Sequence, residues 1–267
     1  MQRTFTDQML REITVEHPPR RIISLVPSQT ELLHALGLGE EVVGITKFCV
    51  HPEAWYRNKT RVGGTKQAKL EKVAALEPDL IIGNKEENTR EDIEILAAQF
   101  PVWMSDIHHL SDALGMIRSV GQLVGREAEG EGLAAEIERR FERLERELSD
   151  KAPIRTAYLI WRKPYMLAAS DTFINAMLQQ AGLANVFAHR SRYPEVSLED
   201  LARANPQAIL LSSEPYPFRE RHLEEFSQAC PQSRVQLVDG EMFSWYGSRL
   251  LEAPGYFRGL RRELLGG

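Results

Sequence analysis

Charged and aromatic residues that could contact a ligand recur after expected strands in both halves of the chain. Ligands of open α/β sheets bind at the carboxyl ends of the strands, so residues in those loops are the first candidates for a site. Aromatic rings in one half and flexible charges in the other suit a broad, flat and partly polar ligand. The ten candidate ligand-binding residues are Lys47, Lys66, Lys85, Glu86, Arg162, Tyr165, Tyr193, Glu241, Trp245 and Tyr246.

Three other aromatic residues, Phe48, Trp103 and Phe243, are interpreted as core or turn residues. Direct metal binding has weaker support. Cys49 and His51 place a thiol and an imidazole two positions apart, but a free cysteine is often a small buried hydrophobe. A histidine before a proline is more often a loop residue than a ligand. We therefore predict no metal site and keep Cys49 and His51 as weak candidates.

Motifs of catalysis do not occur in the sequence. It has no phosphate-binding glycine loop, no nucleophile elbow and no HExxH pattern, and Gly63-Gly64 lacks the spacing of a dinucleotide site. We predict no catalytic residue and no cofactor.

The elements that position these residues are organised around one long helical pattern, residues 127–150. Its apolar residues recur every three or four positions, which predicts an amphipathic helix of roughly 35 Å. We predict that this helix, residues 126–151, links an N-terminal lobe, 1–125, to a C-terminal lobe, 152–267. The residues of the apolar stripe are Leu133, Ile137, Phe141, Leu144 and Leu148.

On both sides of this helix, strands alternate with helices, which predicts an α/β fold with mainly parallel sheets. Residues 4–16 alternate weakly and predict a hairpin or an extended arm. Residues 70–82 and 198–210 echo each other, because in both a Leu-Glu pair opens a short helix, a proline ends it and a strand follows. The echo indicates two similar lobes.

Composition excludes several classes of partner. The net charge is −5 and the pI is near 5.9, and the chain has no basic patch, so we expect no nucleic-acid partner. The N-terminal residues form no apolar signal segment, and no run reaches membrane-spanning length. We expect a monomer that is either cytosolic or the mature form of an exported protein.

Several segments carry a resemblance to a known family. Residues 19–28, PRRIISLVPS, the Leu-Glu…Pro-Asp-Leu-Ile-Ile segment 70–82 and residues 193–199, YPEVSLE, resemble the helical-backbone (class III) substrate-binding proteins of ABC importers. That group includes the vitamin B12-binding and iron-siderophore-binding proteins. The segments 84–88 and 213–218, with Trp245-Tyr-Gly247, are most similar to a subgroup called helical-backbone metal receptors.

The resemblance implies two Rossmann-like lobes joined by a single long helix, with a ligand cleft between the lobes. It implies that the chain binds a metal chelate, either a cobalamin-like corrinoid or a ferric siderophore or haem, and delivers it to an ABC permease. In the family, glutamates at the positions of Glu71 and Glu199 form ion pairs with arginines of the permease. The resemblance implies a periplasmic or extracytoplasmic location, although the absent signal segment leaves the cytoplasm open.

A second function stays open at this point. A cytosolic two-lobed metal-handling enzyme, such as a chelatase, would place His51 and the pair Glu86-Glu87 in the cleft. A carboxylate-histidine pair with perturbed pKa values would favour the enzyme. A site lined by aromatic side chains without such a pair would favour transport.

Overall fold

The computed structural model describes residues 1–266, and the chain divides into two compact units. Unit 1 contains Met1–Ile107, Ser111–Ile137 and Tyr246–Arg249. Unit 2 contains His108–Leu110, Glu138–Trp245 and Leu250–Gly267. The domain boundaries expected from the sequence, at residues 125/126 and 151/152, stay a prediction.

Unit 1 begins with an antiparallel hairpin, which confirms the prediction for this segment. Its strands are β1 (Gln2–Thr6) and β2 (Glu12–Glu16). The turn is held by Asp7, whose carboxylate accepts hydrogen bonds from the backbone N–H groups of Met9 and Arg11, both at 2.9 Å. The Arg11 side chain also pairs with this buried carboxylate.

The sheet of unit 1 is parallel throughout and has the strand order β5-β4-β3-β6-β7. Every residue of β3, β6 and β7 is buried, as expected for strands that are covered on both faces. The chain builds β4 and β5 on one side of β3 and then β6 and β7 on the other. The order therefore reverses between β3 and β6, and this is the switch point of the sheet. The strands are β3 (Ile22–Ser24), β4 (Val42–Ile45), β5 (Thr60–Arg61), β6 (Leu80–Asn84) and β7 (Val102–Ser105).

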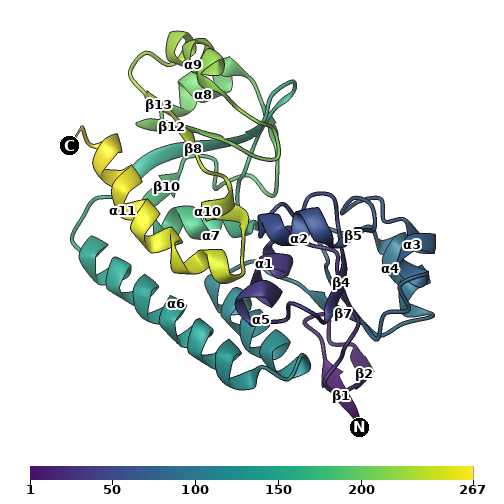
Figure 1. Ribbon diagram of the computed structural model, residues 1–267. Coiled ribbons are helices and arrows are strands. Elements are labelled where there is room, and N and C mark those ends of the chain that lie inside the picture. The colour runs from purple at the N-terminus through teal and green to yellow at the C-terminus, as the bar shows by residue number, and fades with distance from the viewer. Residues whose placement is uncertain (267) are drawn as a thin grey trace. The chain divides into compact units, whose positions relative to one another are not determined.

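The helices of unit 1 follow the strands in the predicted alternation (Figure 1). The first begins at Pro27, because a proline is compatible with the first turn of a helix. Gly37 ends this segment with a φ of 78°. The helices are α1 (Pro27–Ala35), α2 (Glu53–Asn58), α3 (Leu70–Ala74), α4 (Arg90–Ala97) and α5 (Leu110–Leu123).

The long helical pattern forms α6 (Glu127–Leu148), a helix of 22 residues. Its residues up to Ile137 belong to unit 1, and those from Glu138 belong to unit 2. The predicted apolar stripe is confirmed at its centre, where Ile137, Phe141 and Leu144 are buried. Near its start α6 packs closely on α5. A Cβ added to Gly130 would lie 3.0 Å from the Cα of Gly121, so both helices need glycine at this contact.

The sheet of unit 2 has the order β11-β9-β8-β12-β13, and β10 also pairs with β8. Figure 1 labels β8, β10, β12 and β13 of this sheet. Strands β8, β10, β12 and β13 are parallel, whereas β9 and β11 form an antiparallel edge. Its switch point lies between β8 and β12. The strands are β8 (Ile154–Trp161), β9 (Tyr165–Leu167), β10 (Leu183–Asn185), β11 (Glu195–Val196), β12 (Ala208–Ser212) and β13 (Arg234–Val238).

The helices of unit 2 confirm the predicted echo, because α8 and β12 repeat the order of α3 and β6. The C-terminal helix α11 packs against α6, with the rings of Phe141 and Phe257 6.4 Å apart and an ion pair between Glu147 and Arg258. The elements are α7 (Phe173–Gln180), α8 (Leu198–Ala204), η1 (Glu220–His222), α9 (Leu223–Ala229), α10 (Glu241–Ser244), η2 (Ser248–Leu251) and α11 (Ala253–Leu264). Among residues 1–266, no helix combines the length and the apolar character that crossing a bilayer requires.

Candidate functional site

In unit 1, four predicted ligand residues lie at the carboxyl edge of the parallel sheet. Lys47 follows β4, Lys66 lies in the loop after β5, and Lys85 and Glu86 follow β6 directly. Because parallel strands end at one edge, the structure brings these four residues to the same side of the unit. This is the edge at which an open α/β sheet binds ligands.

The three lysines at this edge are exposed and locally bonded. The Lys66 ammonium donates to the carbonyl oxygen of Glu86, and Lys85 Nζ lies 2.6 Å from Asp106 Oδ2. Lys47 Nζ lies 4.9 Å from the centre of the Phe48 ring, within reach of a cation–π contact. The edge therefore offers several ammonium groups to a ligand with acceptor oxygens.

Glu87, which the sequence suggested only as part of the Glu86-Glu87 pair of the enzyme alternative, has an unusual carboxyl group. Burial raises its pKa above the usual range, the charge of neighbouring Glu86 adds to the rise, and Lys66 opposes it. A carboxyl with a raised pKa at a sheet edge is typical of a functional position. No sequence signal separates Glu87 from the neighbouring Glu86 and Glu91.

Phe48 was interpreted as a core or turn residue, and the structure places it in the turn after β4 and not in the core. Phe48 is 50% exposed and Val50 is 40% exposed, while Cys49 between them is fully buried. The Cys49 sulfur lies 3.0 Å from the Thr30 hydroxyl and 3.1 Å from that of Thr46. This buried anchor turns its two apolar neighbours outward at the end of β4.

For Trp103 and Phe243 the same interpretation is confirmed, because both side chains are buried in the core. Burial raises the pKa of the Cys49 thiol, and the hydroxyls of Thr30 and Thr46 only partly oppose this. Within residues 1–266, no group of three or more His, Cys, Asp and Glu side chains is placed to hold a metal ion. His51 lies half-buried two positions after Cys49.

In unit 2, the switch point between β8 and β12 is bordered by aromatic residues. Trp161 ends β8 and is 39% exposed. Its ring meets that of Tyr216 edge-on, with centroids 5.7 Å apart, and the Tyr216 N–H donates to the carbonyl of Ile160 at 3.2 Å. The segment after β12 is thereby held against the end of β8.

Arg162 and Tyr165 share one carboxylate, that of Glu225 on α9. Arg162 Nε donates to Glu225 Oε2 at 2.9 Å, and the Tyr165 hydroxyl donates to Glu225 Oε1. Burial alone would raise the pKa of Glu225, but these two hydrogen bonds and the positive charge of Arg162 hold the pKa below its usual range. Burial and the bond to Glu225 raise the pKa of Tyr165 to about 12.

Tyr165 departs from the sequence expectation in one respect, because it begins the edge strand β9 and does not lie in a loop. Its hydroxyl and the Arg162 guanidinium both depend on Glu225 for their direction. Sequence reasoning missed Glu225, which lies 60 positions beyond Tyr165.

We expect Glu225→Gln to make the free energy of unfolding depend less on pH under acidic conditions. A carboxylate with a lowered pKa in the folded state stabilises the fold above its unfolded pKa of about 4.3, and this contribution is lost as pH falls through the folded value. The wild type should therefore lose more unfolding free energy than the variant between pH 6 and pH 3. Urea unfolding at both pH values measures the difference, and an equal loss in the two proteins would contradict the assigned role of Glu225.

Trp245 and Tyr246 are largely buried, each with 6% exposure. Trp245 Nε1 donates to Glu214 Oε1 at 3.2 Å, and the Ser244 hydroxyl donates to the same oxygen. Glu214 follows β12, so this bond ties Trp245 to the segment beyond the switch point. Only a small part of the indole reaches the surface before a ligand arrives.

The two remaining predicted ligand residues of unit 2 are half-buried. Glu241 begins α10, where its N–H donates to Asp239 Oδ1 at 3.0 Å. Tyr193 lies before β11 with the Arg192 guanidinium 5.3 Å from its ring centre. The two predicted docking residues, Glu71 on α3 and Glu199 on α8, are exposed and take the same position in their helices.

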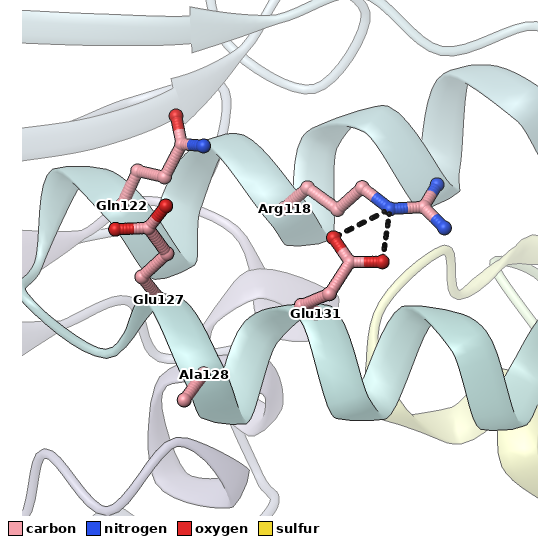
Figure 2. Close-up of a pocket in the computed structure, with 5 residues that line it drawn as sticks. All are labelled: Arg118, Gln122, Glu127, Ala128 and Glu131. Atoms are coloured by element: carbon pink, nitrogen blue, oxygen red, sulfur yellow. Dashed lines mark hydrogen bonds and ion pairs between the residues drawn. The ribbon is translucent and has the colours of Figure 1, made fainter.

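A hollow of about 340 Å³ lies elsewhere in unit 1, between α5 and the start of α6. Figure 2 shows Arg118 of α5 reaching across to Glu131 of α6, with Nε 3.0 Å from a carboxylate oxygen. Gln122, Glu127 and Ala128 complete its lining. The hollow contains none of the residues predicted from the sequence and lies away from the strand ends.

Comparisons with known proteins agree with this geometry. A family model described as periplasmic binding protein matches residues 22–231. A vitamin B12-binding protein of Pectobacterium carotovorum subsp. carotovorum (strain PC1) is 28% identical over 240 residues, covering 88% of this chain and 86% of its own.

Two further proteins extend the comparison. The uncharacterized ABC transporter substrate-binding lipoprotein YvrC of Bacillus subtilis (strain 168) is 25% identical, covering 93% of this chain and 82% of its own. The crystal structure of the periplasmic vitamin B12-binding protein BtuF of Vibrio cholerae superposes with a TM-score of 0.80 at 24% identity. It covers 94% of this chain and 99% of that one, which supports the same two-lobed α/β fold.

Proposed function

The chain belongs to the periplasmic binding protein family, and on that premise we propose that it binds a cobalamin-like corrinoid for an ABC importer. The family is one of binding proteins, so the chain is a transport component and not an enzyme. The expectation of a chelatase-like enzyme is set aside for this reason. The observation that carries the ligand proposal is the similarity to a vitamin B12-binding protein over 88% of the chain.

The geometry supports a large, partly polar ligand. In unit 2, Trp161, Arg162 and Tyr165 lie at or just after the end of β8, and Tyr216 packs beside them. Flat rings beside a guanidinium suit a broad ring system with polar substituents. Unit 1 adds the exposed Phe48 among its lysines.

A ferric siderophore or haem is the second candidate, and one observation favours it. The ammonium groups of Lys47, Lys66 and Lys85 lie at one edge of unit 1. Such groups suit anionic substituents, such as the two carboxylates of haem, better than neutral amides. The two candidates differ in charge, so a binding screen can separate them.

We propose that the ligand contacts residues in the loops after the strands at the switch points. We also propose that the protein is extracytoplasmic and that it docks on an ABC permease. The proposed contacts are Lys47, Lys66, Lys85, Glu86, Arg162, Tyr165, Tyr193, Glu241, Trp245 and Tyr246. The compartment is supported by the periplasmic and lipoprotein relatives.

A thermal-shift and tryptophan-quenching screen tests the ligand proposal. We expect cyanocobalamin at a hundred times its dissociation constant to stabilise the protein by about 2.7 kcal/mol. Haemin, a ferric hydroxamate and free divalent metal ions complete the panel. A larger shift with haemin would favour the second candidate, and no shift with any chelate would reject both.

One substitution can test whether the quenched tryptophan is Trp161 in unit 2. Trp161 is the most exposed of the four tryptophans and ends β8. Trp161→Phe should therefore remove much of the quenching by a corrinoid or a haem. Trp103→Phe, in the buried strand β7, serves as the control that leaves quenching nearly unchanged.

A further inference from the structure

Two buried asparagines lie at the switch point of unit 1. Asn84 ends β6 and is 2% exposed, and Asn88 follows the next turn and is 7% exposed. A buried amide without hydrogen-bond partners is unfavourable, so such side chains are almost always bonded. Their partners show which segments they hold together.

The Asn88 side chain joins three separate backbone segments. Its Oδ1 accepts the N–H of Asn84 at 2.8 Å. Its Nδ2 donates to the carbonyl oxygens of Leu25, at 3.3 Å, and Thr65, at 3.0 Å. Leu25 follows β3 and Thr65 lies beyond β5, so one amide connects the loops after three strands.

Asn84 closes the turn that carries two of the candidate ligand residues. Its Oδ1 accepts the N–H groups of Glu86, at 2.8 Å, and Glu87, at 3.0 Å. Its Nδ2 donates to Ser105 Oγ at 2.9 Å, which fixes the turn to the end of β7. The Asn84 side chain thereby fixes the backbone of this turn to the end of β7.

The N-cap residue of the following helix α4 is Thr89 and not Asn88. The amide is packed so closely that a Cβ on Gly83 would lie 2.7 Å from its Oδ1. The Lys66 ammonium also donates a hydrogen bond to the carbonyl oxygen of Glu86. Two hydrogen bonds thus join residues 63–66 to residues 84–88, one from Asn88 to Thr65 and one from Lys66 to Glu86. We name this pair of loops the switch-point clamp.

We propose that Asn88 is a positioning residue of the ligand site, which holds the switch-point clamp so that Lys66 and Glu86 meet the ligand in a fixed arrangement. Ammonium and carboxylate groups at this edge suit the polar periphery of a chelate. Loops that are ordered in advance lose less entropy when a ligand binds. The ligand part of this inference rests on the proposed function, whereas the ordering of the clamp does not.

The first test compares Asn88→Ala with Asp79→Ala. Asp79 makes the same kind of clamp at the opposite edge of the same sheet, where its carboxylate accepts the N–H groups of Arg20 and Arg21 at 2.7 and 2.8 Å. Amide hydrogen exchange at Gly64, Glu86 and residues 87–88 should be about tenfold faster in Asn88→Ala and unchanged in Asp79→Ala. Asn88→Asp keeps the acceptor for Asn84 and replaces Asn88→Ala if that variant does not fold.

The second test measures affinity for cyanocobalamin and for haemin by tryptophan quenching. Asn88→Ala should weaken binding about tenfold, while Asp79→Ala, at a similar loss of Tm, should leave it nearly unchanged. Lys66→Ala should weaken binding in the wild type but add little in the Asn88→Ala background, since the two residues act through one clamp.

Several outcomes would overturn the proposal. Unchanged hydrogen exchange in the clamp would show that Asn88 does not order it. Equal affinity losses in Asn88→Ala and Asp79→Ala, or additive effects of Lys66→Ala, would show a general effect on stability. If neither probe nor the ferric hydroxamate binds the wild type, the proposed function fails, and hydrogen exchange alone decides whether Asn88 holds the clamp.

Discussion

Replacing Trp245 by Ala is expected to weaken binding of the chelate by about 1–3 kcal/mol, which is the effect of removing an aromatic anchor from a binding site. Trp245 is 6% exposed and its Nε1 is bonded to Glu214, so its ring is held in one position before binding. A ring fixed in this way loses little side-chain entropy on binding. Quenching titrations with cyanocobalamin and haemin measure the change.

Because Trp245 is buried, its replacement by Ala is also expected to lower the free energy of unfolding. Removing a large buried side chain leaves a cavity, and Phe or Trp to Ala substitutions in cores cost about 3–5 kcal/mol of unfolding free energy. Trp245→Ala should therefore lower Tm as well as affinity. This loss of stability follows from the 6% exposure of Trp245.

A matched variant separates these two effects. Phe141 is 2% exposed and lies on α6 in the same unit, packed on Phe257 and away from the strand ends. Phe141→Ala should lower Tm to a similar degree and leave affinity unchanged. If Phe141→Ala and Trp245→Ala lose affinity equally, Trp245 acts through stability and does not contact the ligand.

The fold follows from local patterns in the sequence because those patterns are periodic. The stripe of α6 and the echo of α3–β6 in α8–β12 depend on spacing and on helix-ending residues, and both are local signals. The start of α1 at Pro27 is harder to predict, since a proline can either precede a helix or occupy its first turn. The antiparallel edge β9–β11 was missed because its strands are only three and two residues long.

The candidate site was harder to predict because its geometry depends on contacts between distant residues. Strand-end positions were found for Lys47 and Lys85, since those positions follow from the order of elements. The exposure of Phe48 depends on the anchoring of Cys49 by Thr30, 19 positions earlier. No local pattern in the sequence carries that information.

The last prediction concerns Glu71 and Glu199, which take the second position of α3 and α8. Their local settings differ. Ser197 and Asp200 form a capping box at the start of α8, whereas no side chain caps α3. Backbone and Ser197 hydrogen bonds hold the pKa of Glu199 below its usual range, so it is charged at neutral pH. Two exposed carboxylates at matching positions of the two units thus suit docking on a basic partner.

We propose that both carboxylates form ion pairs with the permease, and we expect Glu71→Arg with Glu199→Arg to abolish ligand-stimulated transport. Both side chains are exposed, so ligand affinity and Tm should change little. Reversal places like charges opposite each other at the docking surface, which blocks association more strongly than neutralisation. Transport in vesicles that contain the cognate permease measures the loss, and docking of the wild type should weaken as salt rises.

The control is Glu129→Arg with Glu145→Arg, which changes the charge equally at two exposed positions of α6, one in each unit. Because this control matches the overall charge, it should transport normally if docking depends on the positions of Glu71 and Glu199. Equal inhibition by both double variants would indicate a general effect of net charge. Loss of ligand binding in the Glu71 and Glu199 variant would make these glutamates structural, and normal transport by that variant would exclude them from docking.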